Sequence, residues 1–273
     1  MNFFFDLKKK DITLGGFLTF RKECELVAQI KNKKIINIFL HSYKKDQKKI
    51  DYFVKEIFLT SNKKILIKKG FKNFYQWHPS LKNYPNYSFM RINYLFKKYN
   101  IFPKLVWDRK LNEKNSLLIK RYKKKIITIH LKYVKPYNDI GNANLNVWLN
   151  FFKENNDFIF LIIGHDKYPK DFRCDNLIFV KNVINNLSSH LALIHKSDAF
   201  IGTASGVTTA ANFSDKPYII FKEPKHDTMQ ILKELKNKNY LFAKKGQKII
   251  RKQINRKELN TAIKYLKGFI KNK

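Results

Sequence analysis

Four hydroxyl side chains lie close together in one stretch of the sequence, at Thr203, Ser205, Thr208 and Thr209. The apolar run before them predicts a buried parallel strand, and the small residues around them predict a tight turn. The residues after the turn predict a helix that begins near Ser205, a suitable N-cap. Ligands of open α/β sheets bind where a strand ends and a helix begins, and backbone N–H groups there favour phosphate. The stretch therefore predicts a phosphate site.

Close packing is the second interpretation of the same stretch. Small residues at a strand-to-helix turn also let the helix approach the sheet, and short glycine motifs have low specificity. The density of hydroxyls favours the phosphate site, where Gly206 would allow a phosphate to approach the backbone. Glu223 follows the next strand and could hold ribose hydroxyls or could be a surface carboxylate.

The second half of the chain alternates between apolar strands and helices. No two-residue hairpin turns separate the strands, which is the pattern of a parallel, doubly wound sheet. We therefore expect an α/β fold of two Rossmann-like domains, residues 1–118 and 119–273, that face each other across a cleft. The expected strands of this half are 126–131, 158–163, 177–180, 199–201 and 218–221, and the expected helices are 141–153, 187–196, 207–213 and one that begins near 256.

The first half begins with a short apolar strand and a loop that contains Gly15 and Gly16. Glycine lets the backbone come close to a packed sheet or to a ligand, and both interpretations stay open. Asp11 in this loop and His41 at the end of the next strand could each act as a general base, although a lone Asp or His is more often a cap or a surface group. The other expected elements are strands at 2–6, 35–40, 54–59, 64–67 and 105–107, helices at 18–30 and 89–99, and an irregular aromatic loop at 71–87.

The net charge of +35 comes from 56 basic and 21 acidic residues. A charge of this size suggests nucleic acid as a partner. Only seven of the basic residues are Arg, however, and nucleic-acid readers rely on the forked hydrogen bonds of Arg. The charge is also spread along the chain, as codon usage in an AT-rich genome would produce. We expect anionic partners such as nucleotide sugars, lipid phosphates and an anionic membrane surface, and not nucleic acid.

Cys24 and Cys174 are isolated in the sequence. They have no metal-ligand spacing and form no disulfide framework, so free thiols in a reducing cytosol are expected. No run reaches the roughly 18 apolar residues of a membrane span, and the apolar start of the chain is too short for a secretory signal. We expect a cytoplasmic protein with peripheral contact to the inner face of the membrane.

Residues 126–221 resemble the C-terminal half of GT-B glycosyltransferases, especially the heptosyltransferase-like group. Three motifs carry the resemblance: ITIHLK, a strand that leads to a basic residue, Lys132; FIFLIIGHD, a strand that closes in glycine before His165; and SDAFIGTASGVTTAANFSDKPYIIF. The match covers about the last 150 residues. TLGGFLTF at 13–20 resembles the glycine-containing first loop of that fold, which faces the acceptor.

The resemblance implies transfer of a sugar from a nucleotide-diphosphate donor to a cell-envelope glycan or a lipid-linked acceptor, with no cofactor and no metal. An enzyme of this kind must neutralise the leaving diphosphate with amides, hydroxyls and basic side chains. No Asp-x-Asp pair stands where a nucleotide-bound metal would be held. On the donor side the implied binding residues are Lys132, His165, Thr203, Ser205, Gly206, Thr208 and Glu223; on the acceptor side Gly15 and Gly16 bind, with Asp11 or His41 as the base.

Three other interpretations of the sequence stay open. A non-catalytic module that binds nucleotide sugars would keep the donor loop and lack the base. A nucleic-acid-binding protein would explain the net charge of +35 and would bind DNA with a steep salt dependence. An epimerase could use the same two-domain scaffold.

Overall fold

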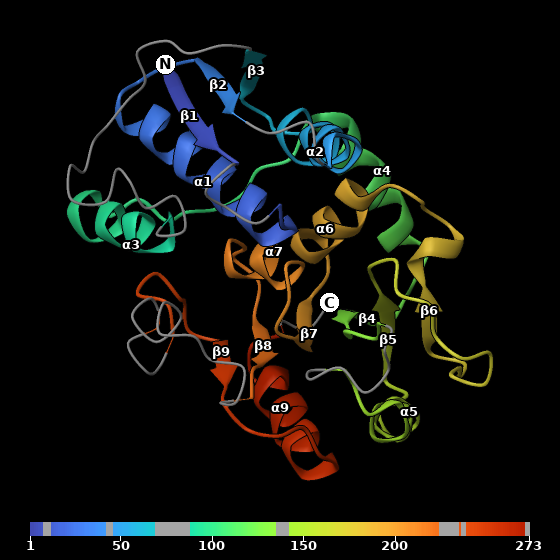
Figure 1. Cartoon of the computed structure of the whole chain (residues 1–273). Coiled ribbons are helices and arrows are strands. Elements are labelled where there is room, and N and C mark those ends of the chain that lie inside the picture. Colours follow the sequence, from blue (N-terminus) through green and yellow to red (C-terminus); the bar gives the residue numbers. More distant parts are fainter. Residues whose placement is uncertain are drawn as a thin grey trace. The chain divides into compact units, whose positions relative to one another are not determined.

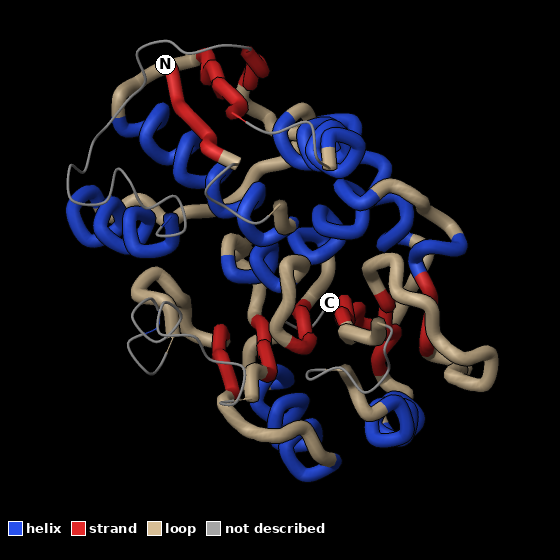
Figure 2. Tube along the Cα trace, in the orientation of Figure 1, coloured by secondary structure: helices blue, strands red, loops and turns tan. Residues whose placement is uncertain are grey.

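The computed structural model describes residues 1–7, 12–41, 46–68, 88–134, 142–223, 235 and 239–270 (Figures 1 and 2). The chain divides into two compact units. Unit 1 comprises Met1–Arg109 and Gln230–Phe242, and unit 2 comprises Lys110–Met229 and Ala243–Lys273. The boundary expected between residues 118 and 119 lies near the end of helix α4 (Arg109–Lys120), whereas this division passes at the start of that helix.

Unit 1 contains a parallel sheet with the strand order β1-β2-β3 among its described residues. Side chains of β1 alternate between the two faces, and Phe3 and Phe5 are buried. This alternation is the pattern of a strand with one face in the core. The elements of unit 1 are β1 (Asn2–Asp6), α1 (Leu14–Ile30), β2 (Ile35–His41), α2 (Gln47–Phe53), the π-helical segment η1 (Val54–Phe58), β3 (Lys64–Lys68) and α3 (Ser88–Tyr99).

Two strands expected in unit 1 are wrong. Residues 54–59 were expected as a strand, but η1 is a turn of π-helix. Its consecutive residues Glu56, Ile57 and Phe58 are all buried, whereas a half-buried strand would expose every second one. The strand expected at 105–107 is reduced to one isolated bridge, between Ser61 and Trp107.

The first turn of α1 replaces part of the expected glycine loop. The helix begins at Leu14 and not at residue 18, because Thr13 caps it: Thr13 Oγ1 accepts a hydrogen bond from Gly16 N at 3.2 Å. This cap satisfies one of the free N–H groups at the start of the helix. Gly15 and Gly16 therefore lie in the first helical turn and not in an open loop.

A cluster of aromatic rings joins the returning segment Gln230–Phe242 to the rest of unit 1. Tyr240 stacks on Phe89 of α3, with ring centroids 4.4 Å apart. Phe242 contacts Phe96 of the same helix edge-on, at 6.4 Å. Unit 1 is thus assembled from residues at two distant places in the sequence.

Helix α1 also carries a buried ionic network. The Glu25 carboxylate is 3 % exposed and accepts hydrogen bonds from Arg21 Nε and Ser61 Oγ, both at 2.6 Å. Lys22 Nζ lies 3.3 Å from its other oxygen. Burial raises the pKa of Glu25, but the charges of Arg21 and Lys22 and the hydrogen bond from Ser61 outweigh it and hold the pKa below its ordinary value of 4.5. Glu25 is thus a buried carboxylate that stays ionised.

Arg21 connects this network to neighbouring segments of unit 1. Its two terminal nitrogens donate to the carbonyl oxygens of Ile57 and Val106, at 2.8 and 2.6 Å. Its guanidinium also lies over the ring of Trp107, 4.6 Å from the centroid. One fully buried cation therefore fixes α1, η1 and the segment after α3 to one another.

Unit 2 is built on a sheet in which all neighbouring strands are parallel, in the order β6-β5-β4-β7-β8-β9. The expected parallel α/β class is confirmed. Strand β9 was not expected from the sequence. The elements of unit 2 are α4, β4 (Lys125–His130), α5 (Leu145–Glu154), β5 (Phe158–Ile162), β6 (Leu177–Phe179), α6 (Leu187–Lys196), β7 (Ala199–Thr203), α7 (Thr208–Asn212), β8 (Tyr218–Phe221), β9 (Gln247–Ile250) and α9 (Arg256–Lys267).

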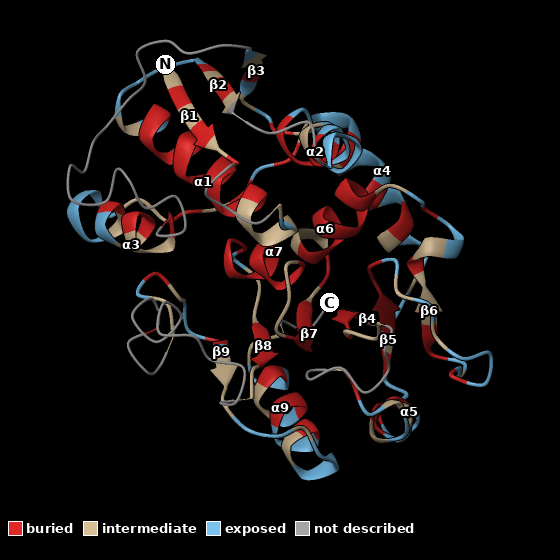
Figure 3. Cartoon of the chain, viewed as in Figure 1, coloured by how far each residue is buried: buried red, intermediate tan, exposed pale blue. Residues whose placement is uncertain are grey.

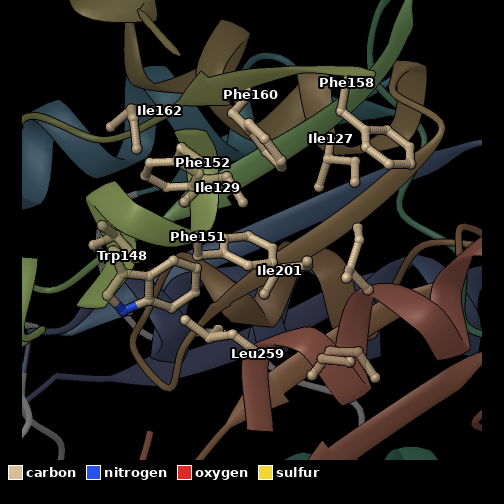
Figure 4. Close-up of a cluster of buried hydrophobic side chains, with 14 of the residues drawn as sticks. Ile127, Ile129, Trp148, Phe151, Phe152, Phe158, Phe160, Ile162, Ile201 and Leu259 are labelled. Atoms are coloured by element: carbon tan, nitrogen blue, oxygen red, sulfur yellow. The ribbon is translucent and has the colours of Figure 1, made fainter. Parts of the chain in front are cut away.

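The hydrophobic core of unit 2 joins the sheet to α5 and α9 (Figures 3 and 4). Trp148, Phe151 and Phe152 of α5 are fully buried, as is Leu259 of α9. Residues 126–129 of β4 are also fully buried, one after another. Burial of successive residues is what both faces of a parallel sheet produce when helices cover them.

The strand order of unit 2 changes direction beside β4. From β4 the chain proceeds outward to β5 and β6, then returns to the other side of β4 as β7 and proceeds outward to β8 and β9. Ligands of open α/β sheets bind at the carboxyl ends of the strands at such a switch point. Here those ends are His130 of β4 and Thr203 of β7.

None of the described helices is both long enough and apolar enough to cross a membrane.

Candidate functional site

The candidate site lies at the switch point, where β4 and β7 end. His130 and Gly202 are paired across the two strands. One step further along, the Lys132 amide donates to Thr203 Oγ1 at 2.9 Å. The structure therefore brings together Lys132 and Thr203, two residues that the sequence predicted on the donor side.

The hydroxyls after β7 form hydrogen bonds within their own turn. Thr208 Oγ1 accepts from Ser205 N at 3.2 Å and donates to Ser205 O at 2.8 Å. Ser205 Oγ accepts from Val207 N at 3.2 Å. These bonds hold the turn closed, as the packing interpretation requires. Helix α7 begins at Thr208 with Val207 at the cap position, so the expectation that Ser205 caps it is wrong.

His130 is a member of the site that the sequence analysis did not single out. Its side chain is 5 % exposed, and its Nδ1 lies 3.1 Å from Ser205 Oγ. Burial lowers the pKa of His130 to about 4, and a hydrogen bond with the Thr203 backbone opposes the shift. The imidazole is therefore neutral at pH 7. The available signal was a single polar residue near the end of the apolar run ITIHLK.

Two glycines make room for His130. A Cβ added to Gly164, just after β5, would lie 3.1 Å from His130 Cδ2. A Cβ on Gly202 would lie only 2.7 Å from the His130 carbonyl oxygen. Gly164 also has a φ of +104°, a conformation that costs energy for any residue with a side chain. Both positions therefore require glycine, and the imidazole is held between β5 and the turn after β7.

A second buried histidine supports the end of β5. His190 of α6 accepts a hydrogen bond at Nδ1 from Gly164 N at 3.0 Å, so its Nε2 donates to Ile184 O at 2.7 Å. His165 is exposed and stacks on the His190 ring with centroids 4.9 Å apart. His165, predicted on the donor side, thus lies one residue beyond the glycine that contacts His130.

Charged groups gather around the residues after β4 and β5. Asp166 accepts from the Tyr133 amide at 3.1 Å, and Lys181 Nζ donates to the Asp166 carbonyl oxygen. Partial burial raises the pKa of Asp166, while the Tyr133 amide and the charges of Lys181, His165 and Lys132 oppose the rise. The region is therefore predominantly cationic, which suits an anionic ligand.

A pocket of about 320 Å³ begins next to Lys132. Tyr133, Leu149 and Phe172 contribute its apolar lining, and Asn144 and Asp171 its polar lining. Its volume is at the small end of the range of small-molecule sites.

The other predicted residues belong to other segments of the chain. Glu223 follows β8 in unit 2 and is half-buried. Gly15, Gly16 and His41 belong to unit 1, where His41 ends β2. Asp11 and the side chain of His41 lie outside the described residues. In the described ranges, no three His, Cys, Asp or Glu side chains come together as a metal site.

Comparison with solved structures finds a similar fold over almost the whole chain. A glycosyl transferase of family 9 from Veillonella parvula has a TM-score of 0.55 and 9% identity, and the match covers 99% of this chain and 89% of that one. The chain has the fold of a family 9 glycosyltransferase. The glycosyltransferase fold expected from the three motifs is therefore confirmed.

Two heptosyltransferases of E. coli are also similar in structure to this chain. ADP-heptose LPS heptosyltransferase II has a TM-score of 0.48 and 11% identity, over 92% of this chain and 80% of that one. Heptosyltransferase WaaC with ADP-2-deoxy-2-fluoro heptose has a TM-score of 0.49 and 9% identity, over 98% and 99%. No protein-family model and no curated protein sequence matches the chain.

Proposed function

We propose that this protein is a glycosyltransferase that moves a sugar from a nucleotide-diphosphate donor to a cell-envelope glycan or a lipid-linked acceptor, without a metal ion. The observation that carries the proposal is the family 9 glycosyltransferase fold across nearly the whole chain. At 9% identity this similarity concerns the fold, so the chemistry is argued from the switch point of unit 2.

The donor diphosphate would bind at the ends of β4 and β7. Negative charge grows on the leaving diphosphate as its bond to the sugar breaks, and fixed donors and cations stabilise that charge. Lys132 supplies a cation beside the turn. Thr203 Oγ1 accepts the Lys132 amide and so has its own proton to donate to a phosphate oxygen. The amides of Ser205 and Val207 already donate to hydroxyls within the turn. We therefore assign the amides of Gly206 and Thr208 as the backbone donors to the phosphate.

Unit 1 would provide the residues that bind and activate the acceptor. A base removes the proton of the acceptor hydroxyl as its oxygen attacks the anomeric carbon of the sugar, and the bond from that carbon to the diphosphate oxygen breaks. We propose Asp11 as this base because it precedes the glycine pair that the family resemblance places on the acceptor side. His41, at the end of β2, is the alternative. General bases of this kind contribute about 10²–10⁴-fold to a rate.

The decisive experiment is a thermal-shift screen of nucleoside diphosphates and their sugars. A ligand whose concentration is one hundred times its dissociation constant stabilises the folded protein by about 2.7 kcal/mol. This stabilisation raises the melting temperature by several degrees. We expect one nucleotide class to do so, with and without EDTA. Loss of the shift in EDTA would contradict metal independence. Salt-steep DNA binding with no nucleotide response would replace the proposal with the nucleic-acid interpretation.

Variants at the switch point test the donor site by calorimetry. Lys132→Ala removes a charge-assisted contact worth about 1.5–3 kcal/mol, so donor affinity should fall about ten- to hundredfold. Gly206→Val should reduce it further, because a branched side chain would block the approach of the phosphate to the backbone. Lys153→Ala is the control, since Lys153 is an exposed cation on α5 of the same unit. Equal affinity of all four proteins would show that the turn is only a packing element.

A further inference from the structure

We infer that binding of the donor diphosphate is coupled to the uptake of one proton by His130, which makes donor affinity dependent on pH. The inference rests on the proposed function, because it concerns the same turn after β7. It adds to the roles proposed for Lys132, Thr203 and Gly206, which contribute a fixed charge or neutral donors and take up no proton.

The hydrogen bond between His130 and Ser205 provides the means of coupling. Nδ1 and Oγ lie 3.1 Å apart, and Ser205 Oγ also accepts the Val207 amide. A neutral imidazole can accept a hydroxyl proton at Nδ1, whereas a protonated ring can only donate. Protonation therefore makes Nδ1 the donor to Ser205 Oγ. The hydroxyl proton of Ser205 is then available to a phosphate oxygen.

The surroundings of His130 keep the ring beside the turn. Its side chain is 5 % exposed. On the β5 side a Cβ at Gly164 would lie 3.1 Å from Cδ2 and 3.3 Å from Nε2, so the ring fills the space that glycine leaves. A charge on the imidazole at this buried position would need a counter-charge that approaches the ring.

The unliganded site provides little to stabilise a charged His130. The sequence from Ala199 to Asn212, which includes β7, the turn and α7, contains no charged residue. From the other elements, Lys132 follows β4, His165 and Asp166 follow β5, and His190 comes from α6. Asp166 is the acid in this set, and its neighbours are the Tyr133 amide and Lys181. Lys222 and Glu223 follow β8, the strand paired with β7. A bound diphosphate would add negative charge on the β7 side of the ring.

The size of the effect follows from the shift that an anion produces. Burial holds the pKa of His130 at about 4 without ligand. An opposite charge within about 4–6 Å raises such a pKa by roughly 1–3 units. For a rise of about two units, binding at pH 5.5 takes up about 0.7 of a proton, and affinity is about fourfold higher than at pH 8.0.

Isothermal calorimetry on the full chain tests the inference. The probes are ADP-glucose, UDP-glucose, GDP-mannose and dTDP-glucose, whose phosphates are both diesters and do not titrate near pH 6. The probe that binds most tightly is measured at pH 5.5 and 8.0 in buffers that differ in ionisation enthalpy. The dependence of the observed heat on that enthalpy gives the number of protons taken up. We expect about 0.7 at pH 5.5 and none at pH 8.0.

The His130→Asn variant identifies the residue that takes up the proton. Its amide can still hydrogen-bond to Ser205 but does not titrate, so proton uptake should disappear while affinity at pH 8.0 changes little. His195→Gln, which removes a histidine of α6 from the same unit, is the control and should keep the uptake. Thermal unfolding checks that both variants fold. NMR of labelled histidine in the unaltered chain gives the same assignment if the Asn variant does not fold.

The possible outcomes separate this inference from the proposed function. Binding without proton uptake overturns the inference and leaves the glycosyltransferase proposal standing. Uptake that persists in His130→Asn also overturns it, and points to His165 or Asp166. If none of the four probes binds, the proposed donor site falls and the inference falls with it.

Discussion

Replacement of Glu25 by alanine should destabilise unit 1 by about 3–5 kcal/mol, because buried cations lose their counter-charge. The carboxylate lies 2.6 Å from Arg21 Nε and 3.3 Å from Lys22 Nζ, and all three side chains are at most 5 % exposed. Each hydrogen bond to a charged group contributes about 1.5–3 kcal/mol. Arg21 keeps two carbonyl acceptors, and Lys22 keeps the carbonyl of Lys104 at 2.7 Å. These remaining contacts limit the loss to the stated range.

Hydrogen exchange of peptides from α1, followed by mass spectrometry, measures the loss of stability in unit 1 alone. A loss of 3–5 kcal/mol corresponds to roughly 10²- to 4 × 10³-fold faster exchange wherever opening limits the rate. The control is Glu258→Ala, which removes an ion pair of similar length, 2.9 Å, whose partner Lys252 is 64% exposed. Exposed pairs contribute at most about 1 kcal/mol. If Glu25→Ala loosens α1 no more than Glu258→Ala loosens α9, the network does not stabilise unit 1 as argued.

Three further predictions concern acid, the acceptor base and a strained glycine. The pKa of Glu25 is lowered in the folded state, so its contribution to stability is present above its ordinary pKa and is lost as the pH falls through the folded value. Acid titration followed by circular dichroism should therefore show a steeper loss of folded protein below about pH 4.5 for the parent than for Glu25→Gln. Asp11→Asn should reduce turnover about 10²–10⁴-fold with donor affinity unchanged, and unchanged turnover would exclude Asp11 as the base. Gly164→Ala should cost about 1–3 kcal/mol and also weaken donor binding at pH 5.5, because it displaces His130. Gly246→Ala has similar strain, with φ of +90° against +104° and Phe269 at 3.0 Å, so equal donor affinity of the two variants would contradict this role of Gly164.

The strands of unit 2 were predictable because burial on both faces demands successive apolar residues. Residues 126–129 and 158–162 show this directly, and the structure has strands at both places. Strand β9 is four residues long and reads QKII, so neither length nor periodicity marks it. In unit 1 the run at 54–58 has the composition of a strand but forms a turn of π-helix. The Ile57 carbonyl of that turn accepts a hydrogen bond from Arg21. Tertiary contacts decide such short segments, and no local pattern records them.

Part of the candidate site was also open to prediction. Thr203 was expected from the end of an apolar strand and Lys132 from the family resemblance, and the two are adjacent because β4 and β7 pair. Ser205 and Thr208 were expected to face a phosphate, yet both bond within the turn. His130 was missed because one polar residue in an apolar strand looks like an ordinary strand position. Its burial, and the glycines that make room for it, depend on strand order.

The return of Gln230–Phe242 to unit 1 has a consequence for biosynthesis. Residues 1–109 leave the ribosome first. The segment Gln230–Phe242, whose Tyr240 and Phe242 pack against Phe89 and Phe96, begins only 121 residues after Arg109 (230 − 109 = 121). At about 5–20 residues per second this delay is roughly 6–24 s. During that interval the aromatic face of α3 has no partner from this segment, and it is accessible to chaperones. Unit 2 is also incomplete at that point, because β9 and α9 follow in Ala243–Lys273, so both units need late-synthesised residues before they can finish folding.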